Sequence, residues 1–170
     1  MRVIVAGFGN VLRADDGFGI AVVHKLHAAG VPAGVEVLDV NIGGIHLVQA
    51  LLAEPADGLV VVDALDLGRA PGTVVVLEPD VLDVTALGVL ERRDHLADMH
   101  YANPERALML VAAMGVLPAR TIMVGCQPED ADAVGQGLSD AVTRGVARAL
   151  VEVRAVVTGM GIEWLNPGGR

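Results

Sequence analysis

The amino-acid sequence predicts a three-layer α/β/α domain on a mixed, mainly parallel five-stranded sheet. Continuous β-branched runs recur along the chain, and segments with apolar residues at helical spacing alternate with them. One pair of runs is joined too closely for a helix to return the chain between them. With 170 residues, 53% of them hydrophobic, the chain is long enough to bury the core of one domain.

Each element follows from its own pattern. The β-branched runs predict strands at residues 2–7, 35–40, 58–64, 73–78 and 121–126. Helical spacing predicts helices at residues 17–29, 43–54 and 104–114, and a last one that Ser139 caps. The segment LDLGRAPG, which separates the third strand from the fourth, is too short for a crossover helix. The fourth strand is therefore expected to run antiparallel to the third.

The ends of the domain follow from where these patterns stop. Residues 1–156 are predicted to form a single domain, and residues 157–170, which end in NPGGR, a loose tail. Residues 80–102 mix charged and apolar side chains without firm periodicity. We expect them to form a long irregular loop, and loops of that length are often functional.

Composition narrows the class of partner and the compartment. A net charge of -9 argues against a nucleic-acid binder, which needs a basic face to displace counterions. No apolar run approaches the length of a membrane-spanning helix, and the N-terminus does not have the pattern of a signal peptide. The single cysteine, Cys126, excludes an internal disulfide framework, which fits the reducing cytoplasm.

The stretch GFGNVLRADDGFG, at residues 7–19, places two carboxylates just after a glycine turn. It lacks the third glycine of the dinucleotide fingerprint, where Leu12 stands, and two acidic groups would repel a phosphate. Asp15 or Asp16 can cap the helix that begins near Gly17, which accounts for one of the pair. The turn is therefore a poor nucleotide site, and one carboxylate is left without a structural role.

Other acids fall at comparable places. Asp63 and Asp66 follow the third predicted strand, Asp39 ends the second, and His100 precedes a predicted helix that begins at Pro104. Sites in open α/β sheets lie outside the carboxyl ends of the strands, where Asp16, Asp63 and His100 can converge. Two carboxylates and an imidazole suit a divalent transition metal, although each residue alone has a plain structural explanation as a cap, a turn residue or an exposed side chain.

Several catalytic groups are missing or already explained. Ser139 is the sole serine and caps a predicted helix, and the sequence contains neither G-x-S-x-G nor H-E-x-x-H. Cys126 follows a strand and is interpreted as a small buried residue. If the protein is a hydrolase, a metal or a carboxylate-activated water remains as the source of its chemistry.

Four stretches in order resemble the hydrogenase maturation proteases, the endopeptidases that trim the large subunit of nickel–iron hydrogenases. These are GFGNVLRADDGFG, VVVDALDLGRAPGTV, MHYANP and VGCQPED, and the likeness covers about residues 2–155. The resemblance implies the same mixed five-stranded sheet. It implies that the chain removes the C-terminal peptide of the large-subunit precursor.

The resemblance also implies a ligand set. Carried over to this sequence, the nickel-binding residues of the family are Asp16, Asp63 and His100, which would also be its catalytic residues. His95 is the alternative to His100, and Asp16 stands where some members have glutamate. The nickel is expected to arrive with the precursor, so that the protein itself would purify without metal. A non-catalytic escort of the precursor and a nucleotide-binding α/β enzyme remain the alternative functions.

Overall fold

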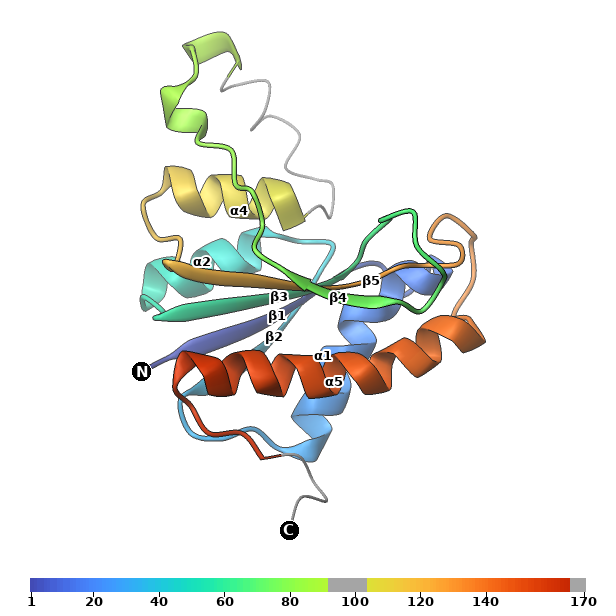
Figure 1. Ribbon diagram of the computed structural model, residues 1–170. Coiled ribbons are helices and arrows are strands. Elements are labelled where there is room, and N and C mark those ends of the chain that lie inside the picture. The colour runs from blue at the N-terminus through green and yellow to red at the C-terminus, as the bar shows by residue number, and fades with distance from the viewer. Residues whose placement is uncertain (92–103, 166–170) are drawn as a thin grey trace.

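A five-stranded sheet with helices on both faces forms the body of the protein in the computed structural model, which describes residues 1–91 and 104–165 (Figure 1). The strands are β1 (Val3–Phe8), β2 (Val35–Asn41), β3 (Gly58–Ala64), β4 (Val74–Leu77) and β5 (Arg120–Cys126). The helices are α1 (Phe18–Ala29), α2 (Ile45–Ala53), α4 (Pro104–Ala113) and α5 (Asp140–Met160), with short 3-10 helices η1 (Ala14–Gly17) and η2 (Val84–Ala86). Every strand and helix predicted from periodicity is present.

The order of the sheet is β2-β1-β3-β5-β4, with β4 the one antiparallel strand. The predicted direction of the fourth strand is confirmed, but its neighbour is β5 and not β3. The connection at residues 65–73 crosses the carboxyl end of β5, where the amide of Gly72 donates to the carbonyl of Gln127 over 2.8 Å. Because this connection only has to pass one strand, it needs no helix.

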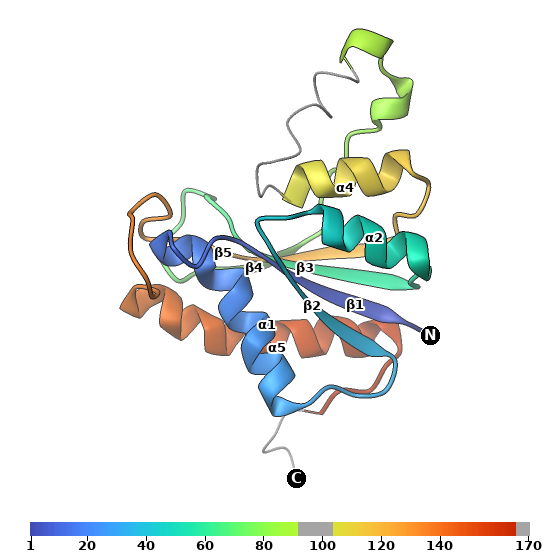
Figure 2. The same cartoon turned by 180° about the vertical axis from the view of Figure 1, so that it is seen from behind.

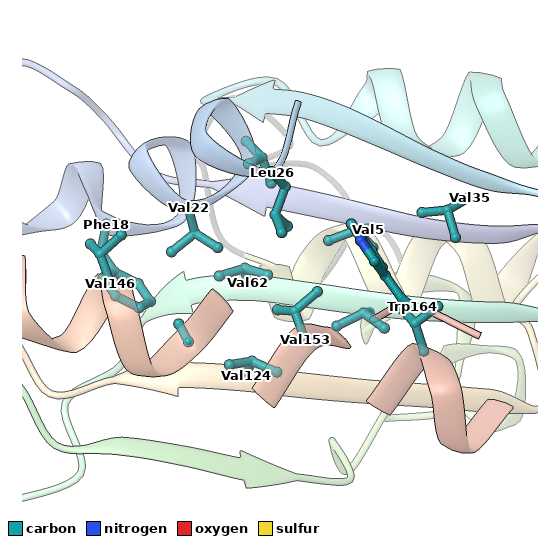
Figure 3. Packing of buried hydrophobic residues seen from close by; sticks show 14 of the residues in the cluster. Val5, Phe18, Val22, Leu26, Val35, Val62, Val124, Val146, Val153 and Trp164 are labelled. Carbon is teal, nitrogen blue, oxygen red and sulfur yellow. The ribbon is translucent and has the colours of Figure 1, made fainter. Parts of the chain in front are cut away.

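The two faces of the sheet carry separate cores because side chains alternate along each strand. Val5, Val62 and Val124 point toward α1 and α5, as Figure 3 shows. Ile4 and Val61 point to the other face, where α2 and α4 cover them (Figure 2). The continuous apolar runs of the central strands thus reflect burial on both faces, as expected of a parallel sheet.

Helix α5 begins as predicted and extends beyond residue 156, where the domain was predicted to end. The hydroxyl of Ser139 accepts a hydrogen bond from the amide of Val142 over 3.3 Å, which confirms the N-cap. The helix then runs for 21 residues and closes at Gly161, whose φ is 114°. Within residues 1–91 and 104–165, neither this helix nor any other has the length and apolarity to span a membrane.

The loose tail expected from residue 157 is wrong for residues 157–165. Val157 and Met160 continue the buried stripe of α5, and Trp164 packs into the same core with 8% of its surface exposed (Figure 3). The amide of Trp164 donates to Thr158 Oγ1, and the guanidinium of Arg154 lies 5.8 Å from the centre of the indole ring. The glycines of the last residues predicted a loose end. Trp164 nevertheless packs on the core, because one tryptophan side chain buries a large apolar area.

Candidate functional site

The glycines near the start of the chain let α1 pack directly on the sheet. A Cβ at Gly19 would lie 2.3 Å from the carbonyl oxygens of Phe8 and Val62. A Cβ at Gly9, whose φ is +127°, would lie 1.8 Å from the carbonyl oxygen of Asp16. The turn is therefore filled by its own backbone, which supports a structural role for these glycines and leaves Gly9 no room for a bound phosphate.

Asp16 is held by this turn. Its Oδ2 accepts a hydrogen bond from the amide of Asn10 over 2.9 Å. Burial raises the pKa of Asp16 above its ordinary value, against the lowering effect of the Asn10 hydrogen bond and of the Arg13 charge. The expected cap is wrong, because the N-cap of α1 is Gly17 and no side chain caps the amides of the helix. Helix α1 follows a 3-10 turn instead, which leaves both carboxylates available for other contacts.

Asp15 points away from Asp16 into the connection between β5 and α5. It is 1% exposed and accepts hydrogen bonds from the amides of Glu129, Asp130 and Ser139 over 2.9, 3.3 and 2.7 Å. Burial alone would raise the pKa of this carboxyl, but the three amides outweigh it and leave the pKa of Asp15 below its ordinary value. Asp15 therefore fixes the acidic turn to residues 129–139, while Asp16 stays at the site.

Asp63 ends the buried run of β3, opposite Gly125 of β5. Only 7% of its surface is exposed. Burial, and then the negative charge of Asp16, raise the pKa of Asp63 well above its ordinary value. A carboxylate from η1, which follows β1, and one from the end of the adjacent strand β3 are thus brought together, as the sequence predicted.

The two aspartates line one pocket of about 540 Å³ at the carboxyl edge of the sheet. Its walls come from the ends of β3 and β4, from the first residues of α4 and from β5. Among the described residues, the lining consists of Asp16, Asp63, Ala64, Leu65, Asp66, Leu67, Leu77, Pro79, Asp80, Pro104, Glu105 and Met123. All the charged side chains in this set are acidic. The pocket therefore has the electrostatic character of a cation site.

The third predicted ligand cannot be placed. His100 and its alternative, His95, lie outside the described residues. Among residues 1–91 and 104–165, no group of three or more His, Cys, Asp and Glu side chains has the geometry to hold a metal ion. The described chain thus supplies two carboxylates whose charges oppose each other, which fits a cation that needs further donors from elsewhere.

Two residues of the pocket, and one polar residue beside it, were not predicted from the sequence. Asp80 and Glu105 line it, although neither ends a strand. Gln127, 7% exposed, directly follows β5 and lies outside the lining of the pocket. Cys126 is buried as expected, and burial together with the charge of Asp15 raises the pKa of its thiol to about 11. A polar residue directly after a predicted strand is the signal from which Gln127 could have been found.

Comparison with known proteins settles the family. A family model described as hydrogenase maturation protease matches residues 20–155. The chain belongs to the hydrogenase maturation protease family. It is 34% identical over 163 residues to the hydrogenase expression/formation protein HupD of Rhodobacter capsulatus, covering 95% of this chain and 74% of that one. It is 36% identical to HupD of Rhizobium leguminosarum over 152 residues, covering 89% and 71%.

The fold of the protease agrees with this assignment. The structure of the hydrogenase maturating endopeptidase HybD from E. coli is similar, with a TM-score of 0.75, 26% identity and 96% of each chain covered. The resemblance drawn from the four sequence stretches is confirmed, as is the mixed five-stranded α/β fold. The chain is accordingly a peptidase of hydrogenase maturation, which sets aside the nucleotide-binding alternative.

Proposed function

We propose that this protease removes the C-terminal peptide of a nickel–iron hydrogenase large-subunit precursor and uses the nickel of the precursor to recognise it. Asp16, Asp63 and His100 are the proposed ligands and catalytic residues. The protease acts in the cytoplasm and holds no permanent metal of its own. The net charge of -9 gives it no general affinity for nucleic acid, and the buried free thiol of Cys126 suits a reducing compartment.

The observation that carries the proposal is the placement of two like-charged carboxylates, Asp16 and Asp63, in one acidic pocket. Burial raises the pKa of both carboxyls, and the negative charge of Asp16 raises the pKa of Asp63 further. A divalent cation between them reverses the repulsion, because each carboxylate then faces a positive charge. The pocket is therefore suited to a substrate that carries its own cation.

This arrangement also supplies the selectivity of the reaction. At an effective dielectric constant of about 20, a unit charge about 4 Å from another contributes roughly 4 kcal/mol. That is roughly a thousandfold in affinity for one such contact. A nickel-free precursor would leave the two acids unneutralised and would bind correspondingly more weakly, so that cleavage waits until the metal is in place.

The residues of the pocket then have distinct parts in the reaction. Asp63, at the end of β3, and Asp16, in the 3-10 turn after β1, hold the metal-bearing end of the substrate, which orients the scissile bond. Nickel supplies Lewis acidity toward that bond. A carboxylate that does not contact the metal at a given moment can hold the water that attacks. Leu65, Leu77 and Met123 provide the apolar walls that limit access of bulk water.

The test is the mass of a nickel-loaded large-subunit precursor before and after incubation with the protease. Nickel-free precursor and the Asp16→Asn variant are run beside it. Loss of a C-terminal peptide is expected only with nickel and only with intact Asp16. A precursor that binds but keeps its mass would identify a non-catalytic escort, and cleavage without nickel would overturn the role given to the metal.

A further inference from the structure

Gln127, the first residue after β5, has a side chain with every hydrogen-bonding position occupied. Its Oε1 accepts from the amides of Leu67 and Arg69 over 2.6 and 3.2 Å. Its Nε2 donates to Asp66 Oδ1 over 3.1 Å and to the carbonyl of Pro128 over 3.3 Å. A primary amide offers two donors and two strong acceptor positions, so this one is fully satisfied inside the protein.

These partners lie in the segment that follows Asp63. Leu65, Asp66 and Leu67 line the pocket, and the backbone holds this connection at its two ends. The amide of Leu65 donates to the carbonyl of Cys126 over 2.9 Å, and the amide of Gln127 donates to the carbonyl of Thr73 over the same distance. Among the described residues, only the side chain of Gln127 bonds to the amides of the middle of the connection, at residues 67 and 69.

We propose that Gln127 is a positioning residue of the protease, which holds residues 65–69 so that the pocket wall beside Asp63 keeps its shape around the substrate. This inference rests on the proposed function. Gln127 does not line the pocket and acts through the segment that it bonds. The same residues that Asp15 contacts, at 129–139, continue directly from Gln127, so that one connection anchors both acid-bearing segments.

The two ends of the amide make separable contributions. Gln127→Leu keeps the volume but leaves the amides of Leu67 and Arg69 without their acceptor. Gln127→Glu keeps that acceptor but loses both donors, and it turns a carboxylate oxygen toward Asp66 Oδ1 and the carbonyl of Pro128. If holding the two amides is what positions the segment, the glutamate variant keeps kcat above that of the leucine variant, although repulsion from Asp66 holds it below the wild-type value.

The matched control is Thr121→Val. Thr121, at the opposite end of β5, is 9% exposed and donates a buried hydrogen bond to the carbonyl of Pro118 over 2.7 Å. Its substitution removes one buried hydrogen bond, so the loss of stability is comparable with that from removing one hydrogen bond of Gln127. Thr121 lies away from the pocket of Asp16 and Asp63, so its substitution is expected to leave kcat unchanged.

The experiment measures kcat and KM for cleavage of nickel-loaded precursor, together with hydrogen exchange of the Leu67 and Arg69 amides. Gln127→Leu is expected to lower kcat by about 10- to 100-fold with a smaller change in KM, since small misplacements cost about that much. Both amides should exchange faster in that variant, and remain protected in Gln127→Glu and Thr121→Val.

Two outcomes would overturn the inference. One is Gln127→Leu with both amides deprotected and kcat at the wild-type value, which leaves the proposed function standing. The other is an equal loss of kcat in Gln127→Leu and Thr121→Val, which would reduce Gln127 to a residue of general stability. If the wild-type protease itself leaves the precursor uncut, the proposed function fails, and the positioning role falls with it.

Discussion

Replacing Asp15 with asparagine removes one buried charge and almost no volume. The wild-type carboxylate accepts three amide hydrogen bonds, two on Oδ2 and one, from Ser139, on Oδ1. An asparagine can place its carbonyl oxygen toward Glu129 and Asp130. Its amino group then faces the amide of Ser139, donor against donor. The variant therefore orphans one partly buried amide and weakens the other two hydrogen bonds.

The expected loss follows from those three contacts. An orphaned buried amide costs about 1–3 kcal/mol, and each remaining hydrogen bond loses about 1 kcal/mol when its acceptor is neutral. The sum is about 3–5 kcal/mol, or a decrease in Tm of about 10 °C for a chain of this length. Cleavage should fall as well, because Asp16 is the next residue in the same turn.

Urea unfolding of the wild type and of Asp15→Asn at several pH values measures this loss of stability. The pKa of Asp15 is lowered in the folded protein, so its stabilisation is complete above the unfolded-state value of about 3.9 and is lost as the pH falls through the folded pKa. The difference between wild type and Asp15→Asn should therefore be full at pH 7 and shrink near pH 3. Asp132→Asn is the control, since Asp132 forms an exposed ion pair with Arg13 and should cost under about 1 kcal/mol.

A difference below about 1 kcal/mol at pH 7 for Asp15→Asn would refute this reasoning. It would mean that the connection at residues 129–139 holds its place without the carboxylate. A difference that does not change with pH would separately show that the charge of Asp15 contributes nothing.

Two further substitutions test the site and the turn. Asp63→Asn should abolish cleavage yet raise the free energy of unfolding at pH 7 by about 1 kcal/mol, because it removes a buried acid whose ionisation opposes folding. Since the folded pKa of Asp63 is raised, this gain should appear as the pH rises above about 3.9, and a variant less stable than wild type at pH 7 would contradict it. Gly9→Ala should destabilise the protein by about 3 kcal/mol or more, because its Cβ would lie 1.8 Å from the carbonyl oxygen of Asp16. Thermal unfolding measures this, and an unchanged Tm would show that the turn is looser than described.

The strands and helices could be predicted from the sequence because the periodicity of apolar residues that indicates each of them lies within the element itself. Strands that are buried on both faces consist of continuous β-branched runs, which can be recognised in the sequence. The carboxyl ends of such parallel strands lie at one edge of the sheet. The proximity of Asp16 and Asp63, which line one pocket, could therefore be predicted from the sequence. The direction of β4 followed from the length of one connection.

The remaining features depend on contacts between segments far apart in the chain. The position of β4 beside β5 depends on the hydrogen bonds that the connection at residues 65–73 forms with the end of β5. Asp15 looked like a helix cap because its amide partners at residues 129–139 are more than a hundred positions away. Trp164 lies in a stretch whose glycines indicate a loose end, and only its packing against α5 shows otherwise. No local pattern contains these pairings.

The most direct test of the central claim is the coordination of nickel in the complex between protease and precursor. Nickel K-edge X-ray absorption would be measured on a nickel-loaded precursor with an uncleavable scissile bond, alone and bound to the protease. Our account predicts new oxygen ligands from Asp16 and Asp63 on binding, and fewer of them with Asp16→Ala. A spectrum that stays the same in a complex shown to have formed would contradict it, because the two carboxylates would then not contact the metal.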